Sequence, residues 1–390
     1  MMASDQSSPR GRGSLGTVAR EWTRLGFTGF GGPPAHIALL RRVVVDRGQW
    51  MDAEEFEDAN AACGLLPGPA STQLAIFCAY RVAGPAGAIV GGLGFVVPAI
   101  VMILALSELF LAGSPPLWVR GAGAGAGAAV AAVAVHAARG LIGPSLARAR
   151  IDRARLLRWI AYVAVGAGAA VAIGPYLVLV LVACGAVEYG VRHPIPPMNT
   201  AAVIALLPAS VSPAGLGALA WTALKVGALS FGGGFVIVPL MQNDAVHVYH
   251  WMTNAQFLNA VALGQVTPGP VVATVCAVGF AAHGLIGGVF AGILAFVPSF
   301  SFILLGGGRF QRLRASLSAR AFLDGAAPAA IGAILGAAVL LALALRDPWQ
   351  VPVLILASVA LLVLRQGVVV TLMSAGVIGA VLAVAGVSVT

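Results

Sequence analysis

Apolar segments long enough to cross a bilayer occupy most of this chain and restrict what it can fold into. Hydrophobic residues make up 59% of the 390 residues, and only 9% are charged. A soluble protein of this length cannot bury so much apolar surface, whereas a bilayer requires it. Backbone polar groups in lipid must be satisfied within each segment. The sequence therefore predicts an all-α polytopic membrane protein.

The chain also contains two similar halves. At an offset of 201, the Pro-Gly-Pro run at 67–69 recurs at 268–270, and four further residues, Gly26, Phe30, Gly31 and Gly32, recur as Gly227, Phe231, Gly232 and Gly233. Further matches continue at an offset of 200, which makes chance identity implausible. The sequence thus predicts a flexible N-terminal tail at 1–14, a first repeat at 15–195, a linker at 196–215 with room for an extra transmembrane segment, and a second repeat at 216–390.

Arginine-rich connections predict that the two repeats are inverted. The first half carries six arginines against one acid over 139–158, after its fourth apolar segment. The second half carries four arginines over 309–320, after its third segment. Basic loops stay cytoplasmic, so equivalent loops are expected on opposite sides of the membrane. This reading gives about 10–13 transmembrane segments, an N-terminus inside, a C-terminus outside, and the acidic connection 46–58 outside.

A Pro-Gly-Pro run interrupts an apolar segment in each half. Proline lacks an N–H and clashes with the preceding turn, so the helix must break. A new helix then starts with a partly positive N-terminus that suits an anion. Inverted repeats with such breaks at matching positions are typical of secondary transporters, although a plain proline kink is the alternative. The predicted substrate-binding residues here are Pro67, Gly68, Pro69, Ser71, Thr72, Gln73, Gln265, Thr267, Pro268, Gly269, Pro270 and Thr274.

Paired glycines mark a second kind of candidate break, in the motifs FGGP and FGGG. Adjacent glycines permit positive φ and close backbone approach, and tight helix packing is the alternative. The predicted site residues in these motifs are Phe30, Gly31, Gly32, Ser230, Phe231, Gly232 and Gly233.

One cation precedes each of these glycine motifs by six residues. Arg24 lies before Phe30, and Lys225, which is the single lysine among 23 basic residues, lies before Phe231. A charge inside an apolar segment is costly and usually functional. Two such cations and two helix N-termini would suit a doubly charged anion, whereas anchoring at the membrane interface is the alternative.

Three weaker features lie near these motifs. His36 could relay protons or bond a backbone carbonyl, and we favour the carbonyl. The run GAGAGAGAAV from Gly121 indicates tight helix contact. Asn60 and Asn259 precede the two Pro-Gly-Pro breaks and could cap a helix or line the site.

The motifs FGGP, LLPGPASTQ, FGGG and QVTPGP resemble those of the chromate transporter family, whose long members join two homologous membrane domains of opposed orientation. The resemblance implies a multi-pass exporter in the bacterial inner membrane that gives chromate resistance, with the CrO4 dianion as substrate and sulfate as its mimic. The chain departs from the family pattern at Gly64, where the second half has Gln265. The family residues that carry over are Phe30, Gly31, Gly32, Pro67, Gly68, Pro69, Thr72, Gln73, Phe231, Gly232, Gly233, Pro268, Gly269 and Pro270.

The function expected from these features is secondary transport by alternating access at the repeat interface. The alternative substrate is sulfate or another tetrahedral oxyanion. An enzyme such as a chromate reductase is disfavoured because reduction needs a redox centre, and the sequence has no haem or flavin motif and no clustered Cys and His. We expect no cofactor or metal and no nucleic acid, since the arginines lie between apolar segments. The expected partners are the dianion and the lipid bilayer, and a homodimer is compatible with the sequence.

Overall fold

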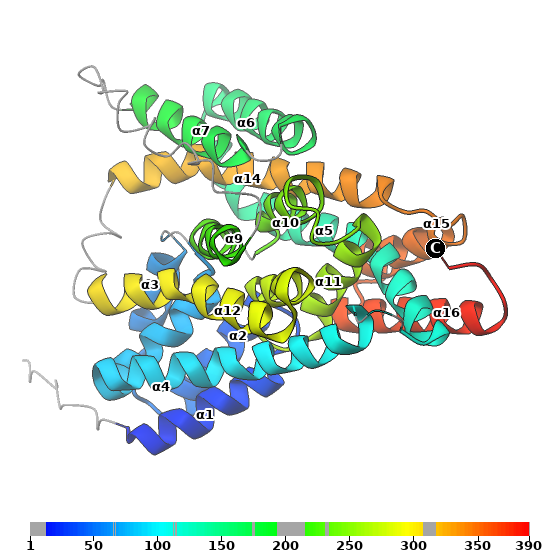
Figure 1. The fold of residues 1–390 in the computed structure, drawn as a ribbon. Coiled ribbons are helices and arrows are strands. Elements are labelled where there is room, and N and C mark those ends of the chain that lie inside the picture. Colours follow the sequence, from blue (N-terminus) through cyan, green and yellow to red (C-terminus); the bar gives the residue numbers. More distant parts are fainter. Residues whose placement is uncertain are drawn as a thin grey trace, which may run out of the picture.

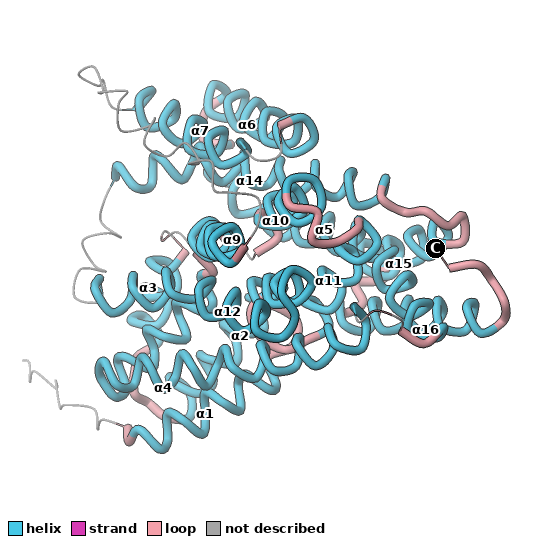
Figure 2. The backbone as a smooth tube through the Cα atoms, in the orientation of Figure 1, coloured by secondary structure: helices cyan, strands magenta, loops and turns pink. Residues whose placement is uncertain are grey.

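The fold consists of helices. The computed structural model describes residues 13–64, 66, 68–111, 113, 115–173, 176–192, 215–230, 234–306 and 317–389. Within these ranges every regular element is helical (Figures 1 and 2), which confirms the predicted all-α class. Most of the predicted N-terminal tail and nearly all of the predicted linker lie outside the described residues.

The elements follow a similar order in the two halves up to the first long helix. The first half holds α1 (Leu15–Thr28), α2 (Pro33–Arg41), the π-helical η1 (Arg42–Arg47), α3 (Ala53–Cys63), α4 (Ala70–Leu111), α5 (Leu117–Ala149), α6 (Arg153–Ala172) and α7 (Leu177–Arg192). The second half holds α9 (Leu216–Leu229), α10 (Ile237–Gln242), the π-helical η3 (Asn243–Val248), α11 (Asn254–Val266), the short η4 (Val271–Ala273), α12 (Thr274–Gly306), α14 (Leu317–Leu343), α15 (Gln350–Ser358), η6 (Val359–Val363) and α16 (Val368–Val384).

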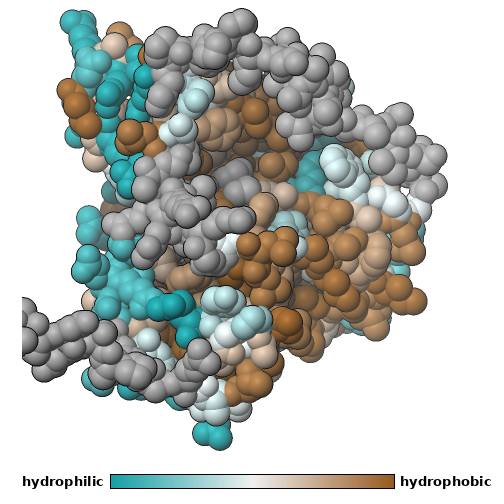
Figure 3. All heavy atoms as spheres, turned by 90° about the vertical axis from the view of Figure 1, so that its left-hand side faces the viewer, coloured by the Kyte–Doolittle hydropathy of each residue, from teal (hydrophilic) through white to brown (hydrophobic). Residues whose placement is uncertain are grey.

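Five of the described helical stretches are long and apolar enough to span a membrane. Large hydrophobic side chains such as Leu285, Ile286 and Ile293 of α12 stay exposed, as lipid contact requires. On the face at the left of Figure 1, hydrophilic side chains gather along one side and hydrophobic ones cover the other (Figure 3). The chain is therefore a multi-pass membrane protein. The five stretches are Ala70–Leu111, Leu117–Ala149, Arg153–Ala172, Val271–Gly306 and Arg320–Leu343.

α4 and α12 are each bent back on themselves. Gly84 has φ 68° and ψ −159°, and Gly284 has φ 62° and ψ −156°. Only glycine adopts this region readily. As a result Gly91 lies against Ala79 in α4. The 42 residues of α4 thus form a hairpin, with a short arm at 70–82 and a long arm at 85–111. α12 repeats this bend at the equivalent position.

Before the long arm of α4 the chain forms two further hairpins, one of α1 with α2 and η1, and one of α3 with the short arm of α4. The open ends of both lie at the same end of the molecule. Gly13, before α1, lies against Val82 at the end of the short arm and against Trp50 in the turn after η1. Arg81 forms an ion pair with Glu55 at the start of α3. Both apolar runs therefore enter and leave at one end, with their Gly/Pro breaks inside.

The placement of the acidic connection 46–58 opposite the N-terminus is wrong. Trp50 lies beside Gly13, so the connection and the chain start share one end. The physical reason is length. The 14 residues of α1 extend only about 21 Å at 1.5 Å per residue, which is short of a hydrocarbon core of roughly 30 Å.

The long arms of α4 and α12 cross in opposite directions. Gly92 lies against Phe300, and Gly292 lies against Ile100. Because these positions differ by 200, each contact has an equivalent in which the two halves exchange roles. An approximate twofold axis perpendicular to the arms generates contacts of this kind.

Glycines bring the remaining helices close together. Gly121 and Gly125 of α5 pack on Gly379 of α16, so the GAGAGAGAAV run does make the tight contact that its spacing predicts. Gly166 of α6 packs on Ala329 of α14. Through α14 and α16 the second half therefore packs against helices of the first.

Candidate functional site

The first Pro-Gly-Pro break lies against the second half of the chain. The backbone N–H groups of Thr72 and Gln73 donate to the Pro69 carbonyl at 3.0 Å, so α4 begins directly after the break. Gly68 is buried with φ 115°. A Cβ there would lie 3.2 Å from the Gly227 carbonyl oxygen and 3.5 Å from Ser299 Oγ. The break therefore touches both α9 and the long arm of α12.

The second break makes the corresponding contact with the first half. Gly269 has φ 105°, and its N–H donates to the Gly29 carbonyl oxygen at 3.0 Å. A Cβ on Gly269 would lie 2.7 Å from the Cβ of Ala99. Ala99 occupies the position that matches Ser299, so each break packs on the long arm of the other half.

Buried polar atoms without a hydrogen-bond partner gather along these breaks. A buried group without a partner costs about 1–3 kcal/mol, so a group of them calls for an explanation such as a ligand or ordered water. Five of these atoms, four hydroxyl oxygens and one amide nitrogen, can each donate a hydrogen bond. The five are Thr72 Oγ1, Ser230 Oγ, Gln265 Nε2, Thr274 Oγ1 and Ser299 Oγ.

His36 joins three segments of this region. Its Nε2 lies 2.8 Å from the Gly29 carbonyl oxygen, and its Nδ1 lies 3.2 Å from Ser71 Oγ. A carbonyl only accepts, so Nε2 carries the proton in this contact. Because Gly29 also accepts from Gly269, His36 links the first glycine motif to both Pro-Gly-Pro breaks. The expected carbonyl bond is therefore present.

The two predicted cations lie in different surroundings. Lys225 Nζ is 2.5 Å from Asp244 Oδ2, and both side chains are nearly buried. Thr222 Oγ1 donates to the same carboxylate oxygen at 2.9 Å. Arg24 lies exposed on α1. Lys225 therefore has a buried anionic partner in Asp244, whose repeat counterpart is Val43, so the two cations do not have equivalent surroundings. That they bind the substrate stays a prediction.

The remaining predicted residues divide into three groups. Gly31 and Gly32 adopt positive φ at the turn before α2, whereas the Phe30 side chain is exposed. Thr267 Oγ1 donates to the Leu263 carbonyl and so closes the end of α11. Four predicted site residues lie outside the described residues, namely Pro67, Phe231, Gly232 and Gly233.

Comparison with known proteins places the chain. The family model described as Chromate transporter matches it twice, at residues 16–189 and again at 217–382. The chain belongs to the chromate transporter family. Membership confirms the predicted transporter and sets aside the enzyme alternative. No solved structure matches this transporter.

Curated relatives match the transporter over most of its length. A chromate transport protein of Cupriavidus metallidurans is 32% identical over 90% of this chain and 88% of its own. A probable chromate transport protein of Synechococcus elongatus is 30% identical, covering 84% of each chain. A chromate transport protein of Pseudomonas aeruginosa is 30% identical over 80% of this chain and 77% of its own.

Two residues of the candidate site were not predicted from the sequence. Ser299 was missed because its repeat counterpart is Ala99 and it lies 29 positions after the nearest Pro-Gly-Pro run. Asp244 could have been noticed as an acid following a long apolar stretch that already held Lys225. Neither residue has a match in the other half, so repetition gave no signal.

Proposed function

We propose that this transporter moves chromate, the CrO4 dianion, through a site between two inverted repeats. The observation that carries the proposal is the set of unpaired hydroxyl and amide atoms along the two breaks. Three relatives that are similar over most of their length carry chromate transport in their names.

The chemistry of the breaks suits a tetrahedral dianion. Hydroxyl and amide groups donate to the anion's oxygens, and the helix N-terminus that follows each break adds a partial positive charge. None of the unpaired atoms at the breaks belongs to a carboxylate, which would repel the ligand. Sulfate offers the same shape and charge, so sulfate or another tetrahedral oxyanion is the alternative substrate.

Inverted repeats and alternating access complete the proposed mechanism. The double family match supports two repeats, and the exchanged contacts between the long arms, which run in opposite directions, support their inversion. Each break packs on the opposite half, so a rocking motion of one half would open the site to either side in turn.

Export from a bacterial cell is the proposed direction, across the inner membrane and in service of chromate resistance. Moving one charge through 100 mV is worth about 2.3 kcal/mol, and a dianion leaving a negative interior gains roughly twice that. The membrane potential alone would therefore drive export without ATP.

Ser299 offers a matched pair of variants for the test. We expect Ser299→Ala, alone and with Thr72→Val, to raise the KM for chromate in proteoliposomes about tenfold or more, because a hydrogen bond to a charged ligand is worth roughly 1.5–3 kcal/mol. Ser107→Ala is the control, since Ser107 is equally buried but bonds the Ile103 carbonyl within its own helix. Wild-type kinetics in both Ser299 variants would refute the proposed site.

A further inference from the structure

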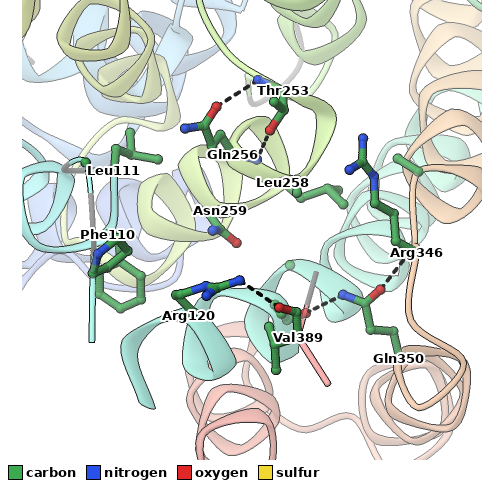
Figure 4. Close-up of a pocket in the computed structure, with 16 residues that line it drawn as sticks. Phe110, Leu111, Arg120, Thr253, Gln256, Leu258, Asn259, Arg346, Gln350 and Val389 are labelled. Carbon is green, nitrogen blue, oxygen red and sulfur yellow. Dashed lines mark hydrogen bonds between the residues drawn. The ribbon is translucent and has the colours of Figure 1, made fainter. Parts of the chain in front are cut away.

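A cavity of about 310 Å³ lies away from the two breaks. It is formed by the end of α4, the start of α5, one face of α11, the segment between α14 and α15, and the last described residues of the chain (Figure 4). None of the described residues that line it is acidic. Its polar lining side chains are Arg120, Thr253, Gln256, Asn259, Arg346 and Gln350.

Two arginines give the cavity its charge. Arg120 is held in place, because its Nη2 donates to the Val389 carbonyl oxygen at 2.8 Å. The guanidinium of Arg346 has neither an ion-pair nor a hydrogen-bond partner within the described ranges. Gln350 steadies the turn that carries Arg346, since its Oε1 accepts from the Arg346 N–H at 2.9 Å and its Nε2 donates to the Ala124 carbonyl at 3.1 Å.

Asn259 fills a space that glycines of α5 leave open. A Cβ on Gly123 would lie 2.8 Å from Asn259 Nδ2, and one on Gly127 would lie 3.2 Å from the Cβ of Leu258. The alternating glycines thus serve two faces of α5, one against α16 and the other against α11. The Asn259 side chain makes no hydrogen bond to a described residue. In Figure 4 it points into the cavity above Arg120.

We propose that this cavity binds a tetrahedral oxyanion as a second station of the transporter, separate from the interface site. Guanidinium groups offer forked donors that match the oxygens of such an anion, and the Gln256 and Asn259 amides add neutral donors. About ten water molecules occupy the same volume in liquid water, so the cavity is large enough for a partly hydrated dianion. The ligand class rests on the proposed function.

The position of the cavity along α11 links it to the interface. Asn259 and Gln265 lie on the same helix six residues apart, about 9 Å along its axis. Gln265 carries one of the unpaired atoms at the second break. A dianion at Asn259 would therefore sit about two helical turns from the proposed interface site.

Equilibrium binding of radiolabelled sulfate and of chromate to the full chain in detergent tests this inference. We expect two dianions per chain in the wild type and one in Arg120→Gln/Arg346→Gln. The control Arg20→Gln/Arg42→Gln removes the same charge from exposed positions and should keep two. Asn259→Asp, nearly isosteric but negative, should weaken the cavity site about tenfold or more.

The outcomes separate the cavity from the interface site. Unchanged stoichiometry and affinity in both cavity variants would overturn the second station while leaving the proposed function intact. Loss of one dianion in the cavity variants, with no change in Ser299→Ala/Thr72→Val, would support the cavity and count against the interface site. If sulfate and chromate bind only at the interface site in detergent, and anionic phospholipid in nanodiscs occupies the cavity, the cavity is a lipid headgroup site and the inference fails.

Discussion

At the scale of single residues, the buried pair of Lys225 and Asp244 changes how the lone lysine is understood. The sequence marked Lys225 as costly in its apolar setting, which is correct, and assigned the compensating charge to a ligand. In the structure Asp244 supplies that charge. The sequence shows Asp244 as an acid after the apolar stretch that holds Lys225, but not that the two side chains pair, because η3 folds back onto α9 across a break and spacing along the chain does not record that contact.

The pair makes a prediction about stability. Lys225→Met leaves the Asp244 carboxylate buried without its cation, and breaking a buried pair costs about 3–5 kcal/mol. We expect the single variants Lys225→Met and Asp244→Asn to unfold at clearly lower temperature in detergent, and the double variant to recover most of the loss. A double variant no more stable than either single one would contradict the pairing.

Transport by the double variant then separates structure from binding. If Lys225 only balances Asp244, the recovered double variant should transport chromate at the wild-type rate. A stable but inactive double variant would instead place the lysine in the substrate path.

At the scale of elements, the sharp bends within α4 and α12 are the feature that the sequence did not predict. The long apolar helices could be expected from apolar runs and Gly/Pro breaks, whereas α3 could not, because it is rich in acidic residues and lies mostly in the segment read as a connection. The bends at Gly84 and Gly284 could not, because the apolar run continues through them and each glycine counted only as one more match between the halves. A sharp bend depends on one pair of backbone angles, which hydropathy does not encode.

The bend at Gly84 allows a test of backbone conformation in which steric overlap of a new side chain plays no part. A Cβ on Gly84 would meet nothing within 4 Å, so Gly84→Ala tests backbone strain alone. We expect a loss of about 1–3 kcal/mol, measured as a lower unfolding midpoint in detergent. Gly140→Ala is the control, because Gly140 has the same open surroundings in a regular helix, where alanine is favoured over glycine. Equal midpoints for the two variants would contradict a required positive φ.

At the scale of the whole molecule, the sequence revealed the all-α class, the transporter family and the doubling of the chain. It misplaced the acidic connection, because sidedness was counted by assuming that each apolar run crosses once. It missed the arginine cavity, because its walls come from five separated segments. Local motifs can be recognised in a sequence, whereas contacts between segments that are distant along the chain cannot.

The most direct test of two inverted copies sharing one site is the sidedness of a matched pair of positions. Leu117 and Leu317 are equivalent at an offset of 200, and both are exposed, while the native cysteines of the described chain are all buried. Leu317→Cys should react with a membrane-impermeant maleimide from the side that holds Leu15→Cys at the start of α1, and Leu117→Cys should react only from the other side. Labelling of Leu117→Cys and Leu317→Cys from the same side would contradict inversion, and with it the shared oxyanion site.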